Sequence, residues 1–574
     1  MTRARSSSVL VLIAGFGAGC GPPPAADDGS VRTRTAIRFE ERIGGSGIDF
    51  EDRHGRVGTD KRHLVETLGG GVALTDFDGD GDLDVFLVGG DPTTGEPPQR
   101  SRLYRNDGGL AFTDVTESAG IDLRVDGTGV AAGDVDDDGD DDLFVATLGR
   151  NVLLLNRGDG TFEERGSEAG FVADLWSSSA AFADLDGDAD LDLFVCGYCV
   201  WGEETVALSN QGGTFRDHRV IAGPRGFEGA PDLLYKNVFA ETGRVAFEDV
   251  TVAAGLGDSR SYALGVVIYD ADDDGDLDLY VANDSEPNAL FLNDGGLSFT
   301  DHGMDAGVAL DPMGNAQAGM GVDAGDVDGD GTTDLFVTNF SHDCNTLYLS
   351  SGTGLFRDGT RRSGLFQPTY IPLGFGCVMF DPDQDGDLDL AVANGHVFPE
   401  MDHHPLITRY AQPNQVFEND GGGRMTEVAG PFGDVVPAVS RGLARGDLDG
   451  DGRVDLFFTN INGRPSLMRN VSEAGGVVVL RLEATGGNRN AIGARVVAEL
   501  DDGRRLRRLL VGGASYLSAS SRAIHLGLGD ASVRRIEVRW PSGAVQTVRG
   551  DWRDRLLRIE EGNDAVEASD LPAS

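Results

Sequence analysis

The sequence is poor in basic residues, in cysteine and in long apolar segments. Its 574 residues include 48 lysine and arginine residues against 95 aspartate and glutamate residues, which gives a formal net charge of −47 at pH 7. This excess of negative charge argues against nucleic acid as a partner and favours cations. Because 40% of the residues are hydrophobic, the acidic composition does not indicate a disordered chain.

The lack of a long apolar run excludes an ordinary transmembrane helix, which needs roughly 18 or more such residues. The N-terminus instead carries Arg3 and Arg5, a shorter apolar stretch over residues 9–18, and then Cys20. This pattern predicts a signal peptide over residues 1–20, and therefore export.

The small residues before Cys20 resemble a bacterial lipobox, in which the cysteine is lipidated, although Gly17 stands where that motif prefers leucine. We therefore predict a cell-envelope lipoprotein, in the outer membrane if the cell is Gram-negative, with plain secretion as the alternative. A lipid on Cys20 would be the expected membrane attachment. Residues 21–36 are rich in proline, alanine and aspartate and are expected to form a flexible tether.

Only four cysteines remain after Cys20, namely Cys196, Cys199, Cys344 and Cys377. Export makes a disulfide between Cys196 and Cys199 chemically possible, and free buried thiols are the alternative. A catalytic or metal-binding pair is disfavoured, because no second Cys-x-x-Cys accompanies the first.

Common catalytic motifs are also missing. The sequence has no Gly-x-Ser-x-Gly at a strand-to-helix turn, no His-Glu-x-x-His and no phosphate-binding loop. Asp402, His403 and His404, near His396 and Glu400, form the one cluster with the residue types of a transition-metal site, and a polar surface loop explains it as well. We therefore do not expect an enzyme, and keep an enzyme acting on polysaccharide as the less favoured alternative.

An acidic motif recurs seven times along the chain. It reads Asp-x-Asp-x-Asp-Gly-x-x-Asp or a close variant, with starts 50 to 86 residues apart. In the third copy Ala189 replaces the glycine. The predicted metal ligands are Asp76, Asp78, Asp80 and Asp84; Asp134, Asp136, Asp138 and Asp142; Asp184, Asp186, Asp188 and Asp192; Asp270, Asp272, Asp274 and Asp278; Asp326, Asp328, Asp330 and Asp334; Asp381, Asp383, Asp385 and Asp389; and Asp447, Asp449, Asp451 and Asp455.

This spacing suits calcium, which takes six to eight oxygen ligands, because a tight loop turns alternate side chains inward. Glycine at position 6 permits the sharp turn, so the copy with Ala189 is the least secure site. An EF-hand would need a glutamate at position 12 between two helices, whereas each loop here is followed by an apolar, strand-like run. We predict about seven structural calcium ions.

The repeat length fits a four-stranded unit, and seven such units over residues 37–472 predict a β-propeller. The last unit lacks a fourth strand, and residues 37–41 have that strand's pattern without a loop before them. We therefore predict that residues 37–41 pair with strands of residues 442–470 and close the ring. The repeats resemble the FG-GAP or VCBS-type repeats of integrin α-subunit propellers, a resemblance that implies calcium sites that brace the loops.

The pattern changes near residue 475. Residues 475–560 contain 15 arginines against 9 acidic residues, an excess of 15 − 9 = 6 positive charges, and alternating apolar residues that favour strands. We predict a separate, sandwich-like β domain, followed by an acidic flexible tail over residues 561–574. The arginines either form a face that docks on the acidic propeller or bind a polyanion around Arg504, Arg505, Arg507 and Arg508.

This second domain resembles the ASPIC/UnbV domain in Asn488-Arg489-Asn490-Ala491-Ile492-Gly493, Gly513-Ala514-Ser515-Tyr516-Leu517-Ser518 and Trp540-Pro541-Ser542-Gly543. With the repeats before it, the chain is similar in architecture to the cartilage acidic protein family. That resemblance implies a secreted, calcium-binding protein. We therefore expect an all-β, monomeric binding, adhesion or scaffolding module for an extracellular or envelope protein or polysaccharide, with a structural or assembly component of the envelope as the alternative.

Overall fold

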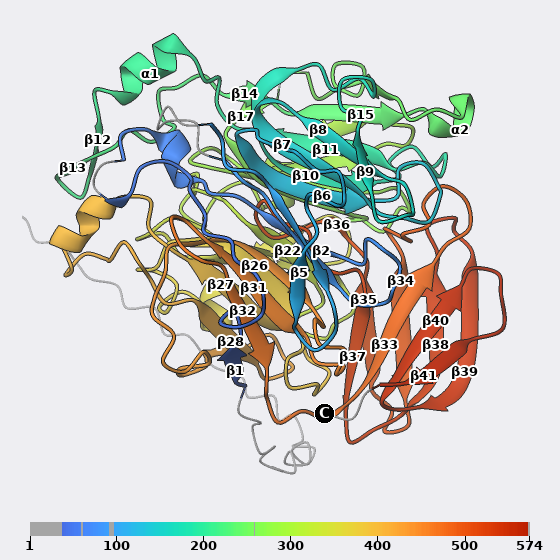
Figure 1. Cartoon of the computed structure of the whole chain (residues 1–574). Helices are drawn as coiled ribbons and strands as arrows, with labels where there is room; N and C mark the ends of the chain where they lie inside the picture. The colour runs from blue at the N-terminus through green and yellow to red at the C-terminus, as the bar shows by residue number, and fades with distance from the viewer. Residues whose placement is uncertain (1–36, 59–60, 91–96, 258, 572–574) are drawn as a thin grey trace, which may run out of the picture. The chain divides into compact units, whose positions relative to one another are not determined.

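The computed structural model describes residues 37–58, 61–90, 97–257 and 259–571. The predicted signal peptide, the lipidation site at Cys20 and the tether lie outside the described residues. Strands dominate the described part of the chain (Figure 1), which confirms the prediction of an all-β protein.

Seven four-stranded antiparallel units contain most of the described strands before residue 471. The first three consist of β2 (Val72–Thr75), β3 (Asp84–Leu87), β4 (Arg102–Asn106) and β5 (Phe112–Asp114); β6 (Gly127–Gly133), β7 (Asp142–Arg150), β8 (Val152–Asn156) and β9 (Phe162–Glu164); and β10 (Asp174–Ala183), β11 (Asp192–Gly197), β15 (Leu233–Asn237) and β16 (Phe247–Asp249). The second and third units share one sheet, because β10 also pairs with β7.

The remaining units follow the same order. They consist of β18 (Ala263–Tyr269), β19 (Asp278–Asn283), β20 (Ala289–Asn293) and β21 (Phe299–Asp301); β22 (Val322–Gly325), β23 (Asp334–Val337), β24 (Thr346–Ser350) and β25 (Phe356–Asp358); β26 (Gly374–Phe380), β27 (Asp389–Asn394), β28 (Gln415–Asn419) and β29 (Met425–Glu427); and β30 (Ser440–Gly446), β31 (Asp455–Asn460), β32 (Ser466–Asn470) and β1 (Phe39–Glu41).

The units form a ring around their first strands. Each of β2, β6, β10, β18, β22, β26 and β30 contacts the next, and β30 contacts β2. Close approach of these strands requires glycine. A Cβ on Gly321 would lie only 2.2 Å from the Phe375 carbonyl oxygen in the next unit. Buried aliphatic and aromatic side chains fill the space between neighbouring sheets, as expected for a propeller.

Strand β1 closes this ring. Phe39 pairs with Asn470 and Glu41 with Met468, in antiparallel register with β32. The predicted closure by residues 37–41 is therefore confirmed. It joins the two ends of the repeat array, because the last sheet takes its outer strand from the start of the described chain.

Short helices and hairpins lie in the connections. They are η2 (Leu64–Thr67), α1 (Glu203–Ser209), β12 (Gly213–Phe215) with β13 (His218–Val220), β14 (Ala230–Pro231) with β17 (Arg260–Ser261), α2 (Phe239–Thr242), α3 (Gly303–Ala306), α4 (Thr360–Ser363) and η3 (Pro399–His403). The longest insertion, residues 198–232, joins the second and third strands of the third unit and carries α1, β12 and β13.

The C-terminal part is a sandwich of two four-stranded sheets. One contains β37 (Ile524–Gly529), β33 (Gly476–Glu483), β40 (Arg555–Glu560) and β41 (Glu567–Asp570), and the other contains β35 (Arg505–Leu509), β34 (Arg495–Leu500), β38 (Val533–Arg539) and β39 (Val545–Trp552). Apolar side chains of both sheets, among them Leu480, Val496 and Ile536, share one core. The predicted flexible tail is wrong for β41, since this strand pairs with β40.

A segment of the C-terminal part enters the centre of the ring. It spans residues 512–522, begins with β36 (Gly512–Gly513), and we call it the plug. It contacts the first strand of all seven units. These contacts are Ala519 with Val72, Leu517 with Val130 and Ser179, Gly513 with Val267, Ser515 with Val322 and Leu443, and Tyr516 with Phe375. The sequence pattern predicted a separate domain and gave no sign of this insertion.

Candidate metal centres

The seven acidic loops occupy equivalent places in the fold. Each joins the first strand of a unit to its second strand, and the aspartate at position 9 is the first residue of that second strand. Carboxylate oxygens at positions 1, 3 and 9 lie within 4.8 Å of one another in the loops that start at Asp76, Asp134, Asp184 and Asp270. The structure thus brings together side chains that the sequence spacing selected.

A shared hydrogen bond shapes the turn. The backbone N–H at position 6 donates to the carboxylate at position 1, at 3.0 Å from Gly81 to Asp76 and at 2.8 Å from Gly452 to Asp447. Gly81 has a φ of +99°, which glycine adopts readily. Ala189 at the same place in the third loop has a φ of +79°, so a side chain there works against the turn.

The carboxylates are buried close to like charges. Burial, the largest cause, together with the neighbouring Asp78 and Asp76, raises the pKa of Asp84 to about 8. The pKa of Asp134 rises to about 7, first because of burial and then because of Asp138 and Asp136. Without a bound cation, burial and the neighbouring negative charges therefore favour the protonated form of these carboxyl groups.

Among the described residues, several loops also have a buried carboxylate oxygen that accepts no hydrogen bond. These atoms are Oδ1 of Asp76, Asp136, Asp326 and Asp447, and Oδ2 of Asp389. Buried acceptors of this kind are normally satisfied, and converging carboxylate oxygens are the ligands that a hard divalent cation prefers. The donor set of these loops therefore fits calcium.

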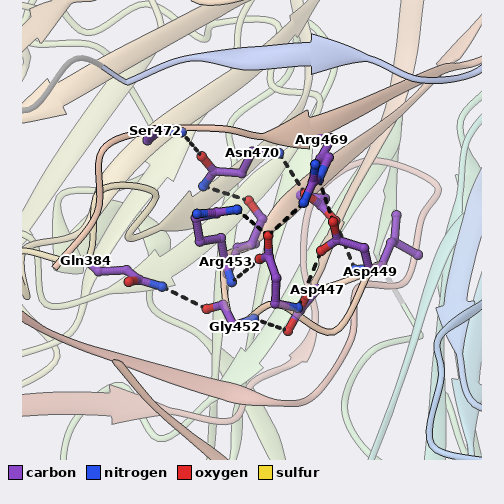
Figure 2. A network of polar contacts seen from close by, with 12 residues as sticks. Gln384, Asp447, Asp449, Gly452, Arg453, Arg469, Asn470 and Ser472 are labelled. Atoms are coloured by element: carbon purple, nitrogen blue, oxygen red, sulfur yellow. Dashed lines mark hydrogen bonds and ion pairs between the residues drawn. The ribbon is translucent and has the colours of Figure 1, made fainter. Parts of the chain in front are cut away.

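The seventh loop carries internal cations as well. Arg469 donates from Nε to Asp449 at 2.5 Å, and both residues are labelled in Figure 2. Its Nη2 donates to Asp451 at 3.2 Å. Arg453 also donates to Asp451. These arginines neutralise positions 3 and 5 in part, while Oδ1 of Asp447 at position 1 keeps no partner.

Asparagines at the ends of third strands connect neighbouring units through the loops. Asn156 Nδ2 donates to the Phe77 carbonyl at 2.8 Å, at position 2 of the preceding unit's loop. The same bond joins Asn106 to Leu448, Asn237 to Val135, Asn293 to Leu185, Asn419 to Val327 and Asn470 to Pro382. This role of the asparagines was not predicted, although their recurrence in the sequence could have indicated it. A loop held rigid by an ion would also hold the next unit.

The C-terminal sandwich contacts the loops through arginines. Arg481 donates to the Gly81 carbonyl at 2.7 Å, Arg495 lies 2.6 Å from Asp270, and Arg508 donates to the Gly386 carbonyl at 3.0 Å. From the plug, Arg522 lies 2.5 Å from Asp141. The face of the ring that carries the loops therefore meets the sandwich.

These contacts bear on the two interpretations of the arginine cluster. Arg504 donates to the Asp385 carbonyl at 2.6 Å, Arg507 lies 4.0 Å from Asp326, and Arg508 lies 3.6 Å from Asp381. Arg504 also pairs within the sandwich, 2.7 Å from Asp502, and Arg505 lies 3.9 Å from Glu499 of the same domain. Three of the four arginines therefore contact the propeller, as the docking interpretation predicts.

The opposite face of the ring carries the connections between second and third strands. There His396 is fully buried against Phe215 and Phe340, and burial, with Arg441 nearby, lowers its pKa to about 3. His404 instead stacks on His218 of the long insertion, with ring centroids 3.5 Å apart. The predicted histidine cluster is thus divided between a buried aromatic group and a surface stack.

The cysteines in the described part of the chain are free thiols. Cys196 and Cys199 are buried, and burial raises the pKa of both thiols well above the ordinary value. Of the two predicted alternatives, the structure therefore has the free buried thiols.

Comparison with known families agrees with this architecture. Residues 76–145, 134–195, 270–337 and 326–392 match the FG-GAP-like repeat, and residues 484–566 match the ASPIC and UnbV family. The chain therefore combines FG-GAP-like repeats, which lie in the propeller, with an ASPIC and UnbV domain.

Cartilage acidic protein 1 is similar to most of the chain. The mouse protein is 25% identical over 520 residues, which cover 87% of this chain and 73% of the relative. The Xenopus tropicalis protein is 26% identical over 517 residues, which cover 83% and 71%. The predicted family is thereby confirmed.

Solved structures show weaker likeness. An Agrocybe aegerita lectin that recognises non-reducing terminal N-acetylglucosamine has a TM-score of 0.35 at 16% identity, over 69% of this chain and 86% of that chain. BBS1N in complex with ARL6DN has a TM-score of 0.38 at 10% identity, over 76% and 97%. Among the described residues, no helix has the length and apolar character needed to span a membrane.

Proposed function

We propose that this protein is an exported binding or scaffolding module whose propeller is braced by calcium, with the ions in a structural role. The observation that carries the proposal is that the two faces of the ring differ in what they carry. One face holds the acidic loops and meets the C-terminal sandwich, so ions bound there would stabilise the fold. The other face holds long connections and is the candidate surface for a ligand.

Three features support the calcium part of the proposal. The repeats are FG-GAP-like, the loops gather carboxylates from positions 1, 3 and 9, and several buried carboxylate oxygens have no hydrogen bond. A divalent cation would supply the positive charge that these groups need. The chain's own residues orient the carboxylates and connect each loop to the next unit.

The face away from the loops has the character of a contact surface. Leu406 is fully exposed, and Leu208 on α1 and Ile371 are 37% and 41% exposed. The stacked rings of His218 and His404 join the long insertion to the connection of the sixth unit. Aromatic and apolar groups on protruding loops suit recognition of a protein or a polysaccharide of the extracellular space or envelope.

Binding is favoured over catalysis because the converging carboxylates described above belong to repeated loops under the sandwich. A polysaccharide-acting enzyme is the less favoured alternative, and it would need paired carboxylates in a cleft of the opposite face. Export rests on the signal-peptide pattern of residues 1–20, and the cell envelope or the extracellular space is the proposed location. We further propose that the protein acts as a monomer.

Two measurements test the proposal on residues 21–574. Thermal unfolding with calcium and with chelator should show a large calcium-dependent rise in midpoint, and an unchanged midpoint would refute structural calcium. Binding to arrays of envelope polysaccharides and of envelope proteins should weaken at least about tenfold, or 1.4 kcal/mol, in a variant with His218→Ala and His404→Ala. Val545→Ser, at an exposed site of the sandwich, is the control. Turnover of a polysaccharide would favour the enzyme instead.

A further inference from the structure

The third acidic loop holds a lysine ammonium group between two of its own carboxylates. Lys236, on β15, donates from Nζ to Oδ2 of Asp186 and, at 2.7 Å, to Oδ2 of Asp188. Its Nζ also lies 3.3 Å from Glu241. Asp186 and Asp188 are positions 3 and 5 of the loop, two of the side chains that calcium would require. The lysine side chain is 21% exposed, so its ammonium group lies largely within the acidic cluster.

Among the described residues, the same strand position places a basic group on positions 3 and 5 of its loop in one other unit, the seventh. This position is the residue before the last one of the third strand, and it is Leu155, Leu292 and Leu349 in the second, fourth and fifth units. In the first unit it is Arg105, which pairs with Asp107 at 2.8 Å rather than with the loop. Arg469 of the seventh unit shows that a long basic side chain at this position reaches positions 3 and 5 (Figure 2).

The position-1 carboxylate does not set the third loop apart, because the equivalent Asp134, Asp270 and Asp381 also accept two backbone N–H groups each. Both oxygens of Asp184, at position 1, accept backbone N–H groups, from Gly187 at 2.8 Å and from Ala189 at 3.1 Å. In the first and fifth loops, Oδ1 of Asp76 and of Asp326 at position 1 has no partner. An ammonium group is a compact charge with three donors, and it would repel a divalent ion held by the same oxygens.

We propose that Lys236 takes the place of calcium in the third loop, so that this loop is neutralised from within and does not bind the ion. The inference rests on the proposed calcium sites of the other loops. Its consequence concerns the unit that carries the long insertion. Asn293 of the fourth unit bonds to the Leu185 carbonyl of this loop at 2.8 Å, so the connection to the fourth unit keeps its support when calcium is low.

The test counts bound calcium in residues 21–574 by equilibrium dialysis with radiolabelled calcium. Lys236→Met should bind one ion more per chain than the unchanged protein, because the third loop then lacks its internal cation. Arg105→Met, at the same strand position of the first unit, is the matched control and should bind the same number as the unchanged protein. Equal counts for Lys236→Met and the unchanged protein would overturn the inference.

Two further variants keep the test decisive. If Lys236→Met does not fold, Leu155→Lys in the second unit should lose one ion, and an unchanged count there would overturn the inference. The midpoint of Lys236→Met should fall below that of the unchanged protein in chelator and recover in millimolar calcium. A failure to recover would also count against it. If the unchanged protein binds no calcium, the proposed structural role of calcium fails. The inference about Lys236 is then tested separately: one ion bound by Lys236→Met supports it, and none overturns it.

Discussion

Replacing Tyr516 by alanine should destabilise the whole ring. Tyr516 lies in the plug with a fully buried side chain, its ring centroid is 5.0 Å from that of Phe375, and its hydroxyl donates to the Leu68 carbonyl at 3.3 Å. The substitution would leave a cavity at the point where the first strands converge.

The expected cost follows from these contacts. Truncation of a buried aromatic residue to alanine costs about 3–5 kcal/mol, and the lost hydroxyl contributes about 0.5–1.5 kcal/mol. Tyr516→Phe removes only the hydroxyl and should therefore cost about 1 kcal/mol. Because the free energy of unfolding of a typical domain is roughly 5–15 kcal/mol, the alanine variant would lose a large part of its stability.

Urea unfolding in millimolar calcium, followed by tryptophan fluorescence and by circular dichroism, measures this loss. Both probes should report one lowered transition for Tyr516→Ala, because the plug contacts every unit of the ring. Val545→Ala, at an exposed site, should stay within about 0.5 kcal/mol of the unchanged protein. A loss below about 1 kcal/mol, or a separate transition of the sandwich with the ring unaffected, would refute the structural role of the plug.

Three other predictions follow. Millimolar calcium should stabilise the folded state by about 0.4–1.5 kcal/mol per occupied loop. Removing it with a chelator should therefore lower the unfolding midpoint, and adding magnesium should not restore that midpoint. Asn156→Ala should cost about 1–3 kcal/mol in urea unfolding because it leaves the buried Phe77 carbonyl unpaired, and a neutral result would contradict the proposed connection between units. Burial lowers the pKa of His54, but Asp52 at 2.5 Å outweighs it and the net pKa is raised above 6.5. This stabilisation is complete below pH 6.5 and is lost as pH rises through the raised pKa, so His54→Gln should flatten that alkaline decline; an identical decline would refute the assignment.

The acidic loops and the ring closure were predictable because both depend on local patterns. Four carboxylates at fixed spacing identify each loop in a single stretch of sequence, and the lone fourth-strand pattern of residues 37–41 needed one partner. The same reasoning identified Ala189 as the weak point of the third loop. These features reflect constraints within one repeat, which a sequence displays directly.

The plug and Lys236 were not predictable in the same way. Tyr516 stands among small residues in a short segment, and the partners of the plug come from seven strands spread over the chain, so no periodicity in the sequence indicates its burial. Lys236 lies 48 residues from Asp188, and only the fold brings them together. The docking of Arg504, Arg507 and Arg508 was one of two open interpretations, because charge excess alone does not identify the surface that the arginines meet.

The placement of the loops links three properties that would otherwise be independent. The loop that would hold an ion also accepts the asparagine of the next unit and meets an arginine of the sandwich, as Asn156 and Arg481 do in the first loop. Order gained by one loop is therefore shared with its neighbours and with the sandwich. The connections on the opposite face take no part in this network, so their sequences can change with less cost to stability. A binding module needs that separation, because its contact surface must vary while its frame stays fixed.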